Sequence, residues 1–83
     1  MKISFTRDGW TDYVSWTTER VILKRINRMI EEAVRERAVG IGKPERLSHN
    51  LSGYWSRRIT DEHRLVYQLR DHELIIVQAR YHY

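Results

Sequence analysis

The sequence contains no cysteine among its 83 residues, only one proline, four glycines and no long hydrophobic run. Without cysteine the chain can form no disulfide, which suits the reducing cytoplasm. No apolar stretch approaches the roughly 20 residues that span a bilayer. Residues 1–10 also lack the apolar centre of a signal peptide. These absences predict a soluble, cytoplasmic protein without a membrane partner.

The charge that is present comes mostly from arginine. The chain has 15 basic and 11 acidic residues, and only Lys2, Lys24 and Lys43 of the basic residues are lysines. A guanidinium group matches phosphate oxygens and stacks on bases, so the composition points to nucleic acid or an acidic protein partner. A solvated surface with internal ion pairs explains the same composition equally well.

The first half of the chain is predicted to hold one strand and two helices. Ile3 and Phe5 alternate with polar residues, which indicates a strand over Lys2–Phe5. A helix capped by Asp8 follows, and Thr17 and Thr18 are predicted to end it and to cap the next. This second helix runs from Glu19 to about Arg37. Its predicted buried stripe consists of Ile22, Ile26, Met29, Ile30 and Ala33.

The second half is predicted to hold a loop and three strands. Gly40, Gly42 and Pro44 mark the loop, and strands are expected at 54–59, 63–69 and 73–83. The order β-α-α-β-β-β with hairpin connections predicts an α+β fold of two layers, with an antiparallel sheet and both helices on one face. The length allows a single domain, 1–83, with one thin core.

The expected strand register divides the side chains between the two faces of the sheet. A two-residue turn at Asp61–Glu62 would pair Ile59 with Arg64 and Arg57 with Val66. The core face then carries Leu65, Tyr67, Leu69, Val77 and Ala79. The open face, turned away from the helices, is expected to carry Trp55, Arg57, Arg64, Gln78, Arg80 and His82.

An open face with guanidinium, indole and imidazole groups suits binding of phosphates and bases, with Arg57, Arg80 and Trp55 as expected RNA contacts. The competing interpretation is an ordinary solvated sheet face. RNA can be cleaved there by acid–base chemistry without a metal. Histidine has an unperturbed pKa of about 6.5, so His82 is a candidate acid, and Glu45 is a candidate base. The sequence pattern does not place these two residues opposite each other.

No metal or cofactor is expected. The four histidines, at positions 49, 63, 72 and 82, do not have the spacing of a zinc site, and cysteine ligands are absent. Trp10 and Trp16 are predicted to lie in the core or on a helix surface.

The stretch "GKPERLSHNLSGYWSRRITDEHRLVY" and the ending "ARYHY" closely resemble YoeB-type toxins of the RelE/ParE superfamily. The resemblance implies a ribosome-dependent endoribonuclease of a type II toxin–antitoxin system, which cuts translated mRNA without a metal. By motif position, Glu45 would be the general base, Arg64 would stabilise the transition state and His82 would be the general acid. Tyr83 would position the RNA, and Arg57 and Arg58 would hold phosphate.

The same resemblance implies a YefM-type antitoxin as partner, mRNA on the 70S ribosome as substrate, and operator DNA only through the antitoxin complex. It leaves a homodimer, the codon preference and the identity of the antitoxin open. The chain departs from the family pattern at Ser48 and at Ala38–Val39. The alternatives are a ParE-type inhibitor of gyrase and a non-catalytic module that binds nucleic acid or antitoxin.

Overall fold

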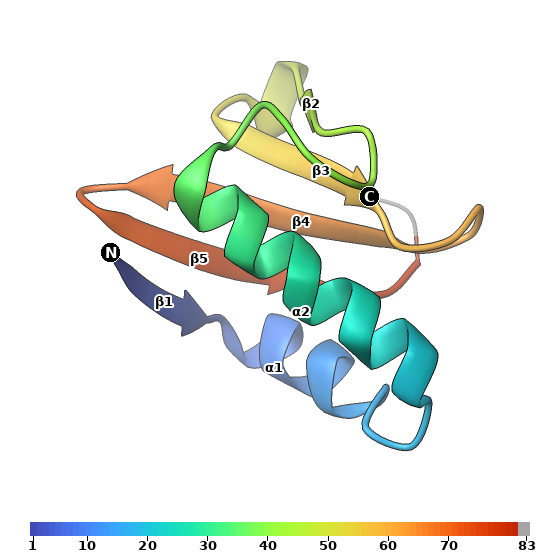
Figure 1. The fold of residues 1–83 in the computed structure, drawn as a ribbon. Coiled ribbons are helices and arrows are strands. Elements are labelled where there is room, and N and C mark those ends of the chain that lie inside the picture. The colour runs from blue at the N-terminus through green and yellow to red at the C-terminus, as the bar shows by residue number, and fades with distance from the viewer. Residues whose placement is uncertain (82–83) are drawn as a thin grey trace.

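The computed structural model describes residues 1–81 as an α+β fold of two layers, which confirms the predicted class (Figure 1). Both helices lie across one face of a five-stranded sheet. The elements are β1 (Lys2–Phe5), α1 (Arg7–Val14), α2 (Arg20–Arg35), β2 (Glu45–Arg46), the short 3₁₀ helix η1 (His49–Leu51), β3 (Tyr54–Arg58), β4 (Arg64–Arg70) and β5 (Glu73–Gln78).

The sheet differs from the expected antiparallel sheet in two ways. Its strand order is β1-β5-β4-β3-β2, and β1 pairs with β5 in parallel, with Lys2 opposite Glu73. The sheet is therefore mixed, because alternation in a sequence identifies a strand without giving its neighbour or direction. The second difference is β2, a two-residue strand within the segment predicted to be a loop. It adds Glu45 to the sheet.

The helices begin at residues other than those predicted. Thr6, not Asp8, caps α1, because its Oγ1 accepts a hydrogen bond from the Gly9 backbone N–H at 3.1 Å. Gly9 is required there, since a Cβ would collide with the Ile76 carbonyl oxygen of β5. The N-cap of α2 is Glu19, so the predicted capping by Thr17 or Thr18 is wrong.

The core lies between the helices and the sheet. The predicted stripe of α2 is confirmed, with all but the half-buried Ile22 fully buried. Each buried apolar side chain contributes about 1.5–3 kcal/mol of transfer free energy. In β5 the prediction that Val77 lies in the core is wrong, and Ile76 is buried there instead. The reason is a bulge opposite Val66 and Tyr67, where the register between β4 and β5 shifts by one residue. No helix among the described residues is long and apolar enough to cross a membrane.

Candidate active site on the open face

The register between β3 and β4 is one residue away from the predicted register. Arg58, not Ile59, pairs with Arg64, and Arg57 pairs with Leu65. The connection is a longer turn in which Thr60 Oγ1 accepts the backbone N–H groups of residues 62 and 63, at 3.3 and 3.2 Å. A one-residue shift moves every side chain of a strand to the other face. The predicted open-face positions on β3 are therefore wrong.

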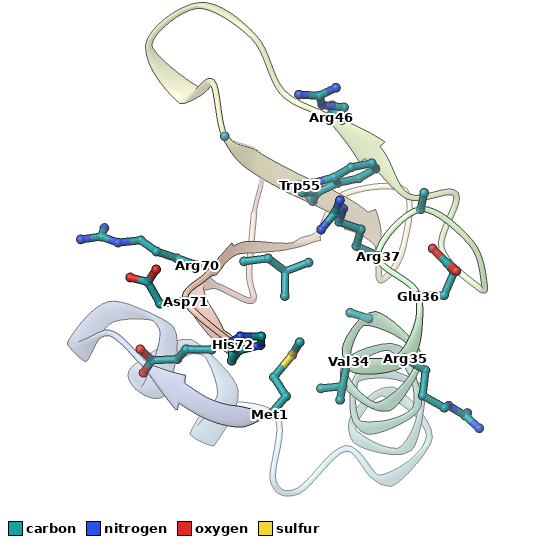
Figure 2. A pocket seen from close by; sticks show the side chains of 15 residues that line it. Met1, Val34, Arg35, Glu36, Arg37, Arg46, Trp55, Arg70, Asp71 and His72 are labelled. Carbon is teal, nitrogen blue, oxygen red and sulfur yellow. The ribbon is translucent and has the colours of Figure 1, made fainter.

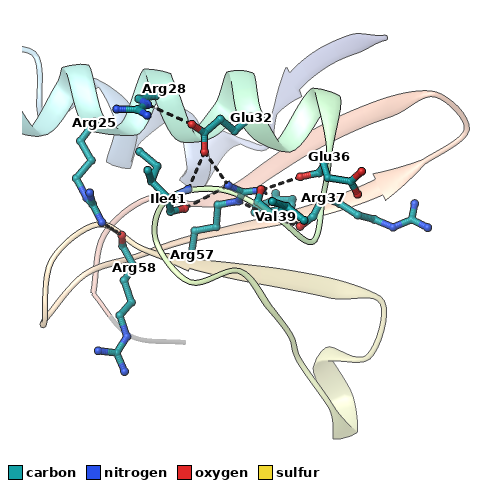
Figure 3. Close-up of polar contacts among 10 residues, drawn as sticks. Arg25, Arg28, Glu32, Glu36, Arg37, Val39, Ile41, Arg57 and Arg58 are labelled. Atoms are coloured by element: carbon teal, nitrogen blue, oxygen red, sulfur yellow. Dashed lines mark hydrogen bonds and ion pairs between the residues drawn. The ribbon is translucent and has the colours of Figure 1, made fainter.

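Arg57 is the clearest case, because its side chain is fully buried on the helix side of the sheet. Figure 3 shows it reaching from β3 into the loop between α2 and β2. Its Nε donates to the Tyr67 hydroxyl at 2.9 Å, and Nη2 donates to the carbonyl oxygens of Glu36 and Val39 at 2.9 Å each. Its Nη1 donates to the Ile41 carbonyl at 3.2 Å. These contacts give Arg57 a structural role.

Glu32 of α2 completes this buried network. Its Oε1 accepts the Ile41 N–H at 2.7 Å and lies 3.6 Å from Arg57 Nη1. The hydrogen bond from Ile41 lowers the pKa of Glu32, and the Arg28 and Arg57 guanidinium groups lower it further against the effect of burial. Gly40 is needed in the loop, because it has φ +121° and a Cβ would collide with the Glu32 carboxylate.

Trp55 also lies on the helix side of the sheet, opposite Tyr67, so its predicted place on the open face is wrong. Its ring lines an open cleft of about 810 Å³ at the C-terminal end of α2. In Figure 2 Arg37 and Arg46 lie beside the indole, and Arg70 and Asp71 lie across the cleft. The Arg46 guanidinium carbon is 6.0 Å from the ring centroid. This cleft is separated from the open face by the sheet.

The open face carries Glu45, Ser56, Arg58 and Arg64. Glu45 pairs with Ser56, which shares a face with Arg58 and lies opposite Val66. The strand register therefore places the candidate base and Arg64 on the same face of the sheet. The Ser56 hydroxyl is buried on this face and has no hydrogen-bond partner among the described residues.

Arg64 is held at the start of β4 by the turn that precedes it. Its Nη1 donates to the carbonyl oxygens of Thr60, Asp61 and His63 at 3.0, 3.2 and 3.2 Å. Only 8% of the residue is exposed. Three carbonyl oxygens around one nitrogen fix the guanidinium group, so a positive charge stands in a constant position on the open face.

The chain leaves the sheet after Gln78, and side chains then hold it in place. The Arg80 guanidinium carbon lies 4.0 Å from the centroid of the Trp16 ring, and Nη1 donates to Ser15 Oγ at 2.9 Å. The predicted open-face position of Arg80 is therefore wrong, because strand alternation ends with the strand. The predictions for His82 and Tyr83 lie outside the described residues.

Sequence reasoning missed the residues that hold the C-terminal segment, namely Asp12, Trp16 and His63. Asp12 Oδ2 accepts the Ala79 N–H at 3.1 Å, Trp16 Nε1 donates to the Ala79 carbonyl at 2.7 Å, and His63 Nδ1 accepts the Tyr81 N–H at 2.8 Å. All three contacts join distant parts of the chain, which local patterns do not reveal. Within residues 1–81, no group of three or more histidine or acidic side chains could hold a metal ion.

Comparison with known proteins places this architecture in a family. Residues 5–83 match the model of the YoeB-like toxins of bacterial type II toxin–antitoxin systems. Toxin YoeB of Streptomyces coelicolor is 58% identical, and Toxin YoeB of Escherichia coli K12 is 51% identical, each over the full length of both chains.

Solved structures agree with the sequence comparison. A YoeB/ParE toxin from Agrobacterium tumefaciens superposes with a TM-score of 0.95 at 43% identity and full coverage of both chains. The toxin of a YoeB–YefM complex from Staphylococcus aureus gives 0.90 at 40% identity, covering 100% of this chain and 98% of that one. The chain therefore belongs to the YoeB-like toxin family of bacterial type II toxin–antitoxin systems.

Proposed function

We propose that this toxin is a ribosome-dependent endoribonuclease that cleaves translated mRNA in the cytoplasm. The observation that carries the proposal is the shared position of Glu45 and Arg64 on the open face of the sheet. The chain that leads into His82 is tied to the same region, since the Arg64 backbone N–H donates to the Tyr81 carbonyl at 3.0 Å. This arrangement supports a base, an anion-stabilising group and an acid acting on one substrate.

The reaction is an internal transfer at an RNA phosphate. The Glu45 carboxylate takes the proton of a ribose 2′-hydroxyl, and the resulting oxygen attacks the adjacent phosphorus. The bond to the 5′-oxygen breaks as His82 gives that oxygen a proton, leaving a 2′,3′-cyclic phosphate and a 5′-hydroxyl. Arg64 offsets the negative charge on the phosphate oxygens, and Tyr83 positions the RNA.

The fixed position of the Arg64 guanidinium favours this role. A charge that is already in place stabilises a transition state without reorganising during the reaction. We assign further phosphate contacts on this face to the exposed Arg58. Arg57, Trp55 and Arg80 are left out of the catalytic face, because their side chains point elsewhere.

Primer extension on translated mRNA with the purified protein tests the activity. New RNA 5′ ends within ribosome-bound codons are expected, and naked mRNA should remain intact. A gyrase inhibitor or a non-catalytic binding module would give no such ends. Glu45→Gln and His82→Gln should each slow cleavage by about 10²- to 10⁴-fold with unchanged melting temperature. Normal cleavage by both folded variants would contradict the proposal.

We also propose a YefM-type antitoxin as partner, because the similar Staphylococcus aureus toxin was solved in a YoeB–YefM complex and also as a dimer. An acidic segment of the antitoxin would cover the open face, with operator DNA bound only through the complex and a homodimer as the state of the free toxin. Arg58→Glu should weaken antitoxin binding in calorimetry more than Arg46→Glu, which lies on the other face. Equal effects would argue against this placement.

A further inference from the structure

Residues 79–81 are held by side chains from several other parts of the chain. Asp12 and Trp16 bind the two backbone groups of Ala79. The Gln78 Nε2 donates to the carbonyl oxygens of residues 80 and 81, at 2.9 and 3.0 Å. Tyr81 is held at both of its backbone groups by neighbouring residues at the start of β4. His63 accepts its N–H, and the Arg64 N–H donates to its carbonyl.

The contact between His63 and Tyr81 fixes the state of the imidazole ring. A backbone N–H can only donate, so Nδ1 must accept and carries no proton. The ring is therefore neutral, with its proton on Nε2. It is 91% buried, and it packs edge-on against the Trp16 ring with centroids 5.0 Å apart and against the Tyr81 ring at 5.4 Å.

Tyr81 needs this support because its backbone is in the left-handed region, with φ +61°. A bulky aromatic residue rarely adopts this conformation, and it persists only where surrounding contacts determine it. The left-handed residue turns the chain directly before His82. Its two backbone hydrogen bonds therefore hold the residue directly before His82 in place.

We propose that His63 is a positioning residue for cleavage: its neutral Nδ1 holds the Tyr81 N–H and so anchors the residue directly before the proposed general acid, His82. The inference rests on the proposed ribonuclease function. A merely space-filling role would require only the shape and apolar contacts of the ring, whereas the proposed role requires an acceptor at the position of Nδ1.

Two substitutions at position 63 separate these roles. The Oδ1 of asparagine lies as many bonds from the backbone as the Nδ1 of histidine, so His63→Asn keeps the acceptor but loses the ring. His63→Leu fills the apolar surroundings but offers no acceptor. His72→Asn is the matched control, because His72 lies in the β4–β5 turn at φ +62°, where asparagine is tolerated. Its side chain lines the cleft on the opposite side of the sheet.

The first measurement is single-turnover cleavage of mRNA on programmed ribosomes. Misplacing a reacting group by about 1 Å costs about 10²-fold. We therefore expect His63→Leu to cleave about 10²-fold more slowly, with His63→Asn retaining most of the rate and His72→Asn unchanged. Wild-type cleavage by a folded His63→Leu variant, or equal losses in the leucine and asparagine variants, would overturn the proposal.

The second measurement needs no activity and so separates failure of this inference from failure of the proposed function. Nitrogen-15 NMR of the free protein should show His63 as the Nε2–H tautomer, with slow hydrogen exchange at the Tyr81 amide. Exchange should stay slow in His63→Asn. An Nδ1–H tautomer or a rapidly exchanging Tyr81 amide in the wild type overturns the proposal, even if His63→Leu does not fold or no RNA is cleaved.

Discussion

Arg57 and Arg64 lie on neighbouring strands, yet they serve opposite faces of the sheet. Arg57 points to the helix layer, where Nη1 and Nη2 hold the loop between α2 and β2 and Nε donates to the Tyr67 hydroxyl of β4 (Figure 3). Arg64 points to the open face and is held by its own turn. Both groups bind backbone carbonyls, and both are almost fully buried. Residue type and burial are therefore the same for the two residues. The structural Arg57 and the candidate catalytic Arg64 differ in the face of the sheet to which the side chain points.

The largest effect is expected when the helix-side network is broken. Arg57→Met keeps an unbranched side chain of the length of the arginine's apolar stem but leaves the Tyr67 hydroxyl and several loop carbonyls without their donor. Removing one member of a buried charged pair costs about 3–5 kcal/mol of unfolding free energy. Urea denaturation would measure this loss. Arg58→Met, the exposed neighbour, should stay within about 0.5 kcal/mol of the wild type. Similar losses in the two variants would refute the assignment.

Arg64→Ala is expected to act on the reaction. Loss of one charge-stabilising group typically reduces a rate by about 10²- to 10³-fold. Raising the pH should not restore the rate, since the missing group transfers no proton. Cleavage assays between pH 6 and 9 measure this. If Arg64→Ala lost as much unfolding free energy as Arg57→Met, both arginines would be structural and the distinction between them would be wrong.

Trp16→Phe probes the support of the C-terminal segment with a smaller effect. Phenylalanine keeps a ring beneath Arg80 but loses the hydrogen bond to the Ala79 carbonyl, which contributes about 1 kcal/mol. The melting temperature should fall by about 4–8 °C. Trp10→Phe is the control, because Trp10 is more than half exposed. A larger fall in the control would contradict the importance of this bond.

Glu32→Gln should give the smallest effect, and it should depend on pH. The folded state lowers the pKa of Glu32 below the ordinary value of 4.5, so its ionised form stabilises the fold. That contribution is fully present above pH 4.5 and is lost as the pH falls through the folded-state pKa. Melting curves of wild type and variant should therefore differ at pH 7, and this difference should shrink steadily as the pH is lowered below 4.5. Glu31→Gln serves as the exposed control, and a constant difference would count against the network.

Local patterns predicted the α2 stripe and the three hairpin strands, because amphipathic periods depend on burial alone. The side of the sheet on which Arg57 lies could not be predicted, because it depends on the length of the turn between β3 and β4. A two-residue turn at Asp61–Glu62 is one residue out of register with the actual connection, in which Thr60 binds the following backbone. Strand alternation placed Arg64 on the open face and acid–base chemistry made Glu45 a candidate base, and the family resemblance then assigned their roles. Their shared face required the pairing of β2 with β3, and that pairing involves only two residues.

The parallel pairing of β1 with β5 joins the first strand of the chain to be synthesised with the last. Ser4 Oγ donates to the Glu73 carboxylate at 2.6 Å across 69 positions of sequence. Contacts between such distant segments form late, because a long loop must close first. The β1–β5 pairing at the edge of the sheet can therefore form only after β5 has been translated. The same holds for the contacts that hold residues 79–81. The residues of the proposed site therefore come together only when synthesis of the chain is nearly complete.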